Sequence, residues 1–258
     1  MALPSFETYR LELKPNGVLI ATFNRPEVYN AVNQTLEHET LDLLRAVTLD
    51  DSIRVVVLTG AGKAFSVGGD IDYLQKSSVD PELAAGGAVG HYVPIMRAMI
   101  DLEKPIIAAI NGYAIGFGLG MALMSDITIM ADTAKLMCGQ LRINAVPAEA
   151  PFLWPLLCGL AKAKYYVLTS EFIDASEAER IGLVSLVVPA DQVMDKAMAT
   201  ADLLAARGRT AVGWTKRAMN HWLRLGAPIL DTALALEALS FLMPDMQTGL
   251  ASMKKTIS

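Results

Sequence analysis

The chain has 258 residues, of which 53% are hydrophobic, so it can bury a sizeable core within one large domain. Its formal net charge of −5 argues against a nucleic-acid partner, because nucleic-acid-binding proteins normally carry a basic surplus. The N-terminal residues lack the features of a signal peptide, and the longest apolar stretches are shorter than the roughly 20 residues that a membrane span needs. Cys138 and Cys158 lie in apolar sequence and are expected to be buried, reduced thiols, which indicates a cytoplasmic protein. Because no stretch is long enough to span a membrane, we expect no membrane partner.

Apolar runs rich in β-branched residues predict strands, and runs with apolar residues at helical spacing predict helices. In chain order these are a strand at 17–23, a helix at 30–51, strands at 53–59 and 104–110 with a helix at 92–102 between them, a helix at 116–124 and a strand at 126–132. Strands that alternate with helices indicate an α/β domain with largely parallel strands. The segment 76–91 is rich in Ser, Pro and Gly, which predicts a mobile loop that could serve as a lid.

The sequence changes character near residue 190, where successive amphipathic helices rich in Ala, Met and Leu begin. We therefore expect two parts, an α/β core over 1–190 and a C-terminal helical region over 191–258. The apolar faces of these helices are expected to pack on the core or on a neighbouring subunit.

Two glycine-rich turns, at 60–74 and 111–123, each follow a strand that is expected to be buried. Glycine permits a tight turn and the close approach of a ligand, and a helix that begins there directs free N–H groups outward. Two such turns side by side could donate two backbone N–H groups to one oxygen, which is an oxyanion hole. Taken alone, each turn is explained more simply by close packing, and the spacing Gly116-x-Gly118-x-Gly120 matches neither a dinucleotide fingerprint nor a P-loop.

Four segments resemble the enoyl-CoA hydratase/isomerase, or crotonase, superfamily, in order and over nearly the whole chain. They are FNRPEVYNAV, RVVVLTGAGKAFSVGGDIDYL, KPIIAAINGYAIGFGLGMALMSDITIMADTAKL and ASEAERIGLVSLVVP. The resemblance implies an α/β spiral of ββα units with a C-terminal helical region that covers the active site and assembles a homotrimer or a dimer of trimers. It implies acyl-CoA thioesters as substrates, with coenzyme A as part of the substrate, no separate cofactor and no metal.

The resemblance also assigns residues to the site. The two N–H donors to the thioester oxygen fall on Gly69 and Phe117. Lys254 or Lys255 is expected near the CoA phosphates. The other positions expected to bind substrate are Arg25, Val28, Ala64, Val67, Asp70, Ile71, Gly116, Gly120 and Gln140.

The sequence departs from the family where hydratases carry their two glutamates. One carboxylate activates water while the other handles the proton at the α-carbon, but the corresponding positions here are Gly120 and Gln140. Glu149 is the nearest replacement, and an apolar setting would raise its pKa toward that of a useful base. It could instead cap the helix that begins near Pro151, or face solvent.

The remaining polar and aromatic residues are weaker candidates. His91 could enter the site from the 76–91 segment but is expected to be an ordinary, partly exposed histidine, and Glu237 is expected on a helix surface or at an interface. We expect structural or packing roles for His38, His221, Ser66, Asp126, Tyr113 and Trp154.

Three functions follow from these residues. The first is an acyl-CoA enzyme, a lyase or isomerase, that stabilises an enolate at Gly69 and Phe117 and moves a proton with Glu149, with isomerisation favoured over hydration. The second is a hydrolase of the same family that cleaves a C–C bond or a CoA thioester. The third is a catalytically silent protein that binds acyl-CoA.

Overall fold

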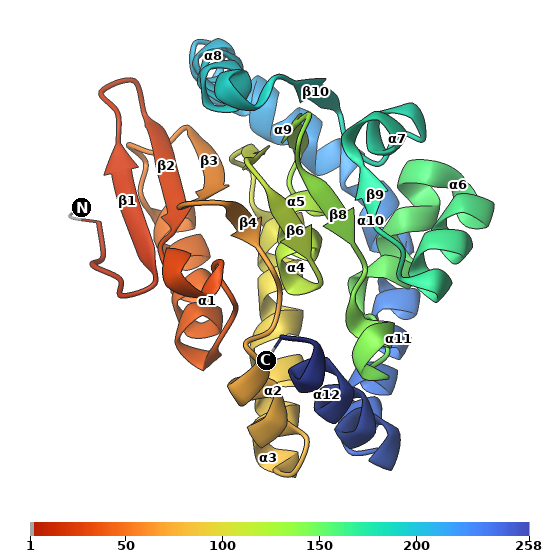
Figure 1. Ribbon diagram of the computed structural model, residues 1–258. Coiled ribbons are helices and arrows are strands. Elements are labelled where there is room, and N and C mark those ends of the chain that lie inside the picture. The colour runs from red at the N-terminus through yellow and green to blue at the C-terminus, as the bar shows by residue number, and fades with distance from the viewer. Residues whose placement is uncertain (1–2, 258) are drawn as a thin grey trace.

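The structure, a computed structural model, describes residues 3–257, though not the side chains of residues 85, 88–90 and 254–257. Two sheets lie among the helices (Figure 1). The larger sheet has the strand order β1 (Tyr9–Leu13), β2 (Val18–Phe23), β3 (Val55–Gly60), β5 (Ile106–Ile110), β7 (Ile127–Ala131), β10 (Leu186–Val188). The smaller sheet has the order β4 (Ala64–Ser66), β6 (Tyr113–Ile115), β8 (Lys135–Met137), β9 (Ile173–Asp174).

A repeated unit connects the two sheets. A strand of the larger sheet leads to a strand of the smaller sheet and then to a helix, first as β3, β4 and α2 (Ile71–Ser77), then as β5, β6 and α5 (Phe117–Leu123), and then as β7, β8 and α6 (Glu149–Thr169). The strands pair in parallel except at β1–β2 and β8–β9. The spiral of ββα units that the sequence predicts is therefore confirmed.

The predicted strands and helices of the first half are confirmed with small shifts at their ends. β3 and β5 are buried on both faces, which explains their unbroken apolar sequence. The helix expected at 30–51 is α1 (Gln34–Leu49), which begins after Asn33 because the Asn33 side chain accepts a hydrogen bond from the Leu36 N–H at 3.0 Å. The helix expected at 92–102 is α4 (Val93–Asp101).

The prediction of a loop at 76–91 was wrong, because most of this segment is helical, whereas its mobility and its role as a lid stay predictions. It contains the end of α2, the short helix α3 (Pro81–Ala85) and a π-helix η2 (Gly86–Tyr92). The Asp80 side chain accepts hydrogen bonds from the N–H groups of Glu82 and Leu83, and Pro81 stands at the first helical position. A cap, a first-turn proline and glycines are common in loops too, so composition alone favoured the wrong structure.

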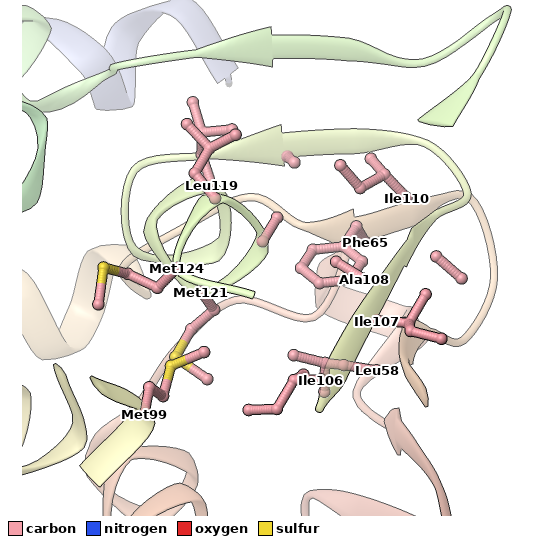
Figure 2. Close-up of a cluster of buried hydrophobic side chains, with 14 of the residues drawn as sticks. Leu58, Phe65, Met99, Ile106, Ile107, Ala108, Ile110, Leu119, Met121 and Met124 are labelled. Carbon is pink, nitrogen blue, oxygen red and sulfur yellow. The ribbon is translucent and has the colours of Figure 1, made fainter. Parts of the chain in front are cut away.

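The main core fills the space around the larger sheet, α4 and α5. Figure 2 shows buried apolar side chains from β3, β4, β5, α4 and α5 in one cluster, among them Leu58, Phe65, Met99, Ile107 and Leu119. Cys138 is buried as predicted, but Cys158 on α6 is partly exposed, so the prediction of two buried thiols was wrong for Cys158. This core fixes β4 and the start of α5, between which the site described below lies.

The C-terminal helices pack back on their own chain. They are α8 (Val193–Ala205), α9 (Arg209–Met219), α10 (His221–Leu225), α11 (Ala227–Phe241) and α12 (Pro244–Ile257), preceded by α7 (Ala175–Arg180). α8 packs on β3, β5 and β7, whereas α11 packs on α6 and η2, and α12 packs on α2 (Figure 1). The division of the chain at residue 190 stays a prediction.

Within the described part of the chain, no single helix is both long enough and apolar enough to span a membrane. Only the bent pair Ala227–Phe241 and Pro244–Met253, with 75° between its two parts, reaches the required length and composition.

Candidate active site

A cavity of about 1000 Å³ lies between the two glycine-rich turns and the C-terminal helices. Its wall is mostly apolar and comes from α2, η2, the start of α5, α11, α12 and the 3₁₀ helix η3 (Gln140–Ile143), among other segments. Eight of the residues expected in the site line it: Val28, Val67, Gly69, Asp70, Ile71, Gly116, Phe117 and Gln140. Arg25, Ala64, Gly120 and Glu149 lie outside the lining, and the side chains of Lys254 and Lys255 are not among the described residues.

The two glycine-rich turns are in direct contact at the cavity wall. Gly68 and Gly116 have φ values of 82° and 52°, which a side chain disfavours. A Cβ atom on Gly68 would lie 2.8 Å from the Ile115 carbonyl oxygen, so the turns approach this closely only because residue 68 is glycine. The turn before α2 and the turn before α5 therefore present their backbones side by side.

Each turn directs one N–H group away from its own secondary structure. Val32 bridges Gly69 in parallel, with the Val32 N–H donating to Gly68 O at 2.7 Å and the Asp70 N–H donating to Val32 O at 2.9 Å. In such a bridge the Gly69 N–H points away from Val32. Phe117 is the first residue of α5, so its N–H has no acceptor within the helix.

Buried polar contacts hold the first turn in place. The Arg25 guanidinium lies 3.3 Å from the Asp70 carboxylate and also donates to the Ala31 carbonyl. Ser66 is fully buried, and its hydroxyl donates to the Asn30 carbonyl at 2.7 Å. Asp70 in addition caps α2 by accepting from the Asp72 N–H. Ser66 therefore has the structural surroundings expected of it, and Asp70, which was expected to bind substrate, both lines the cavity and holds the first turn.

Glu149 is buried at the start of α6, behind the cavity wall. Only 1% of Glu149 is exposed, so the alternative that it faces solvent was wrong. Its carboxylate accepts a hydrogen bond at 2.7 Å from the hydroxyl of Tyr92, which lines the cavity and packs against the Phe117 ring. Burial raises the pKa of Glu149, although hydrogen bonds from Tyr92 and Gln140 act in the opposite direction. Burial and the nearby Glu149 also raise the pKa of Tyr92 well above its usual value.

Tyr92 and Glu149 fill the space that a side chain at position 120 would need. A Cβ atom on Gly120 would lie 2.7 Å from the Tyr92 hydroxyl oxygen and 3.1 Å from the Glu149 carboxyl carbon. An acid at position 120 and the Tyr92–Glu149 pair therefore exclude one another in this packing.

Glu237 also belongs to the cavity, and the prediction that it lies on a helix surface was wrong. It projects from α11 into the lining and is 9% exposed. Burial, together with the nearby carboxylates of Glu149 and Glu37, raises the pKa of Glu237 well above its usual value. α11 and α12 thus cover the cavity of their own chain, through Glu237, Phe241 and Met253.

Glu37 and Tyr73 line the cavity as well, although no motif or spacing predicted this. The Tyr73 hydroxyl donates to Glu37 Oε2 at 2.9 Å, and His91 Nδ1 lies 3.5 Å from the same oxygen. The His91 ring packs edge-on against that of His38, with 4.0 Å between the centroids. His91 is partly exposed, as predicted, but it touches the carboxylate of the cavity wall.

The other candidates have structural surroundings. Asp126 pairs with Lys216 at 2.8 Å and accepts from the Ile106 N–H, Trp154 is fully buried, and Tyr113 packs on Phe172. His221 lies exposed at the start of α10. Among the described residues, no group of three or more His, Cys, Asp or Glu side chains could hold a metal ion.

Comparison with known proteins gives a consistent result. The model of the enoyl-CoA hydratase/isomerase family matches residues 13–247. A crotonyl-CoA hydratase of Syntrophomonas wolfei is 32% identical in an alignment that covers 96% of this chain and 95% of the hydratase. A 1,2-epoxyphenylacetyl-CoA isomerase of Escherichia coli is 33% identical over 86% of this chain and 84% of its own.

Solved structures agree with the sequence relatives. The crystal structure of an enoyl-CoA hydratase/isomerase from Mycobacterium paratuberculosis superposes with a TM-score of 0.91 and 33% identity, covering 96% of this chain and all (100%) of the other. Both the sequence and the fold therefore match along almost their entire length. The chain belongs to the enoyl-CoA hydratase/isomerase family of enzymes, the crotonase superfamily.

Proposed function

We propose that the cavity binds an acyl-CoA thioester with its carbonyl oxygen at the N–H groups of Gly69 and Phe117. Two observations support this proposal: both residues line the cavity, and their two turns are in contact through Gly68 and Gly116. Donors fixed in this way stabilise the negative charge that develops on the oxygen when a proton leaves the α-carbon. The start of α5 adds the partial positive charge of a helix N-terminus.

The reaction we propose is double-bond isomerisation, which moves one proton from the α-carbon to the γ-carbon. The Tyr92–Glu149 hydrogen bond carries this proposal, because it links a carboxylate of raised pKa to Tyr92, whose ring packs against the proposed oxyanion donor Phe117. The α-proton passes to the Tyr92 oxygen as the Tyr92 proton passes to Glu149, and the electron pair moves to the thioester oxygen. The reverse transfer delivers a proton to the γ-carbon of the dienolate, and the double bond becomes conjugated with the thioester.

Replacement of the carboxylate tests this proposal. Glu149→Gln keeps the size and a hydrogen-bond acceptor for Tyr92 but removes the base, so kcat for conversion of 3-hexenoyl-CoA into 2-hexenoyl-CoA should fall by roughly 10²–10⁴-fold. Tyr92→Phe should lower kcat as well, because Glu149 lies behind Tyr92 and outside the cavity lining. The control is calorimetric binding of hexanoyl-CoA, which should change little. A kcat within twofold of wild type in Glu149→Gln would remove Glu149 from the mechanism.

A second candidate function rests on Glu237. This carboxylate lies in the cavity lining beside Glu149, and a pair of carboxylates can activate water. Water addition or hydrolysis of a thioester or C–C bond would then depend on Glu237, whereas isomerisation depends on the Tyr92–Glu149 pair and not on Glu237. Glu237→Gln should leave the isomerisation rate within a fewfold of wild type and should abolish any hydrolysis or hydration that the enzyme shows.

A further inference from the structure

The cavity wall contains one polar cluster away from the proposed oxyanion donors, formed by Glu37, Tyr73 and His91. We call it the distal polar cluster. Glu37 and Tyr73 line the cavity, and the Glu37 side chain is 10% exposed. Most of the surrounding lining is apolar, with Leu74, Ala84 and Phe241 among the cavity residues. A carboxylate in such a wall is costly unless hydrogen-bond donors surround it.

The protein itself satisfies this carboxylate only in part. A carboxylate offers about four sites for hydrogen-bond donors. Tyr73 supplies one donor at 2.9 Å, while His91 Nδ1 lies 3.5 Å away and is a buried atom without a hydrogen-bond partner among the described residues. Glu37 therefore faces the cavity with fewer donors than its two oxygens can accept, while the unpartnered His91 ring nitrogen lies outside the cavity lining.

A glycine keeps the cavity side of this cluster open. Gly87 of η2 lines the cavity, and a Cβ atom there would lie 2.8 Å from the Tyr73 hydroxyl oxygen and 3.7 Å from Glu37 Oε2. Any side chain at position 87 would press on Tyr73 and narrow the approach to Glu37. The space in front of the polar atoms is thus left free for a ligand.

The position of the cluster relative to the thioester follows from α1 and α2. Both helices begin directly after the Val32–Gly69 bridge, and Glu37 and Tyr73 lie within their first turns. One turn advances about 5.4 Å along a helix axis. With C–C bonds of about 1.5 Å, an extended acyl chain spans this distance with roughly four carbon atoms.

We propose that the distal polar cluster binds a hydroxyl group on the acyl chain, about four to six atoms from the thioester carbon. A hydroxyl can donate to the Glu37 carboxylate and so supply a donor that the protein itself leaves out. An alkyl end would remove water from the Glu37 carboxylate without forming a hydrogen bond to it. An ammonium end would bring a second charge into a mostly apolar wall and would cost more to desolvate than a hydroxyl. This substrate class rests on the proposed binding of acyl-CoA in the cavity.

Binding of matched, unreactive acyl chains tests the inference without turnover. Calorimetry would compare 5-hydroxypentanoyl-CoA with hexanoyl-CoA, which have the same number of non-hydrogen atoms and differ only by a hydroxyl in place of a methyl group. Wild-type protein should bind the hydroxyl compound about tenfold more tightly or better, since a hydrogen bond to a charged group is among the stronger ones. The same comparison at 6-hydroxyhexanoyl-CoA and heptanoyl-CoA would cover the next chain length.

Two variants separate recognition from a purely structural role. Glu37→Leu should reverse the preference toward the alkyl chain, and Glu37→Gln should weaken it several-fold while keeping a polar side chain that Tyr73 can contact. If Glu37→Gln lowers Tm but leaves the preference unchanged, the cluster only ties α1, α2 and η2 together and the inference is overturned. Equal affinity of wild-type protein for both members of each pair would also overturn it. Failure of all four acyl-CoAs to bind would remove the proposed function as well.

Discussion

Glu237 shows how a single residue can escape a sequence pattern. α11 is rich in Ala and Leu, so its apolar residues point to packing but do not tell which face meets a cavity. Glu37 was missed for a different reason, because an acid in the first turn of α1 is already explained by helix preferences. Gly69 and Phe117 became the predicted donors through the family resemblance, whereas the glycines of their turns indicated only that two backbones could approach one ligand. Glu149 could be singled out because no other acid stands near the loop where the family places one.

The buried state of Glu237 makes stability depend on pH. Its pKa is raised in the folded protein above its ordinary value of 4.5, so the protonated form is favoured on folding. Its contribution is fully favourable below pH 4.5 and is lost as pH rises through the folded pKa. Glu237→Gln removes the cost of ionising a buried carboxylate at high pH. The variant also removes the electrostatic repulsion between Glu237 and the carboxylates of Glu149 and Glu37.

Thermal unfolding of wild-type protein and Glu237→Gln between pH 4 and pH 8 checks this sign. The two melting temperatures should be close near pH 4, and the melting temperature of the variant should rise relative to that of wild type as pH increases. For a chain of this size, 1 kcal/mol corresponds to about 2–4 °C. A variant that loses stability relative to wild type as pH increases would show that Glu237 is ionised and well compensated in the fold.

At the scale of elements, the contact of α5 with β4 sets the position of the proposed oxyanion donor. A Cβ atom on Gly118 would lie 2.5 Å from the Ser66 Cβ atom and 2.6 Å from the Ser66 carbonyl oxygen. The apolar runs predicted β4's neighbours and α5 well, whereas the helices of segment 76–91 were missed because capping groups and glycines imitate a loop. The close packing of Gly118 on β4 could not be predicted from the sequence either, because it depends on how α5 and β4 meet in the fold.

Gly118→Ala should therefore push α5 away from β4 and displace the Phe117 N–H. Overpacking of this kind costs about 1–3 kcal/mol of unfolding free energy, and catalysis should fall further than stability alone explains. Gly86→Ala is the matched control, because its Cβ meets nothing within 4 Å and its φ of −60° suits alanine. Denaturant unfolding that shows equal losses in both variants would contradict the importance of this contact.

For the whole molecule, the alternating elements predicted an α/β domain with largely parallel strands, because each strand and helix is specified locally, and the family resemblance implied the spiral of ββα units. They did not reveal that α11 and α12 close over the cavity of their own chain, since that depends on how distant helices pack. α9, α10 and α11 also expose Trp214, Trp222, Leu225 and Leu239, apolar surface of the kind that subunit contacts use. The homotrimer or dimer of trimers expected from the family resemblance stays a prediction.

Product analysis with 3-hexenoyl-CoA tests the central claim most directly. The proposed oxyanion donors Gly69 and Phe117 and the single Tyr92–Glu149 base predict 2-hexenoyl-CoA, with unchanged mass and a conjugated double bond, as the first product. Mass spectrometry together with the absorbance of the conjugated thioester distinguishes this outcome from the others. A product heavier by one water, or free coenzyme A with the carboxylic acid, would contradict isomerisation and assign the chemistry to water activated at Glu237.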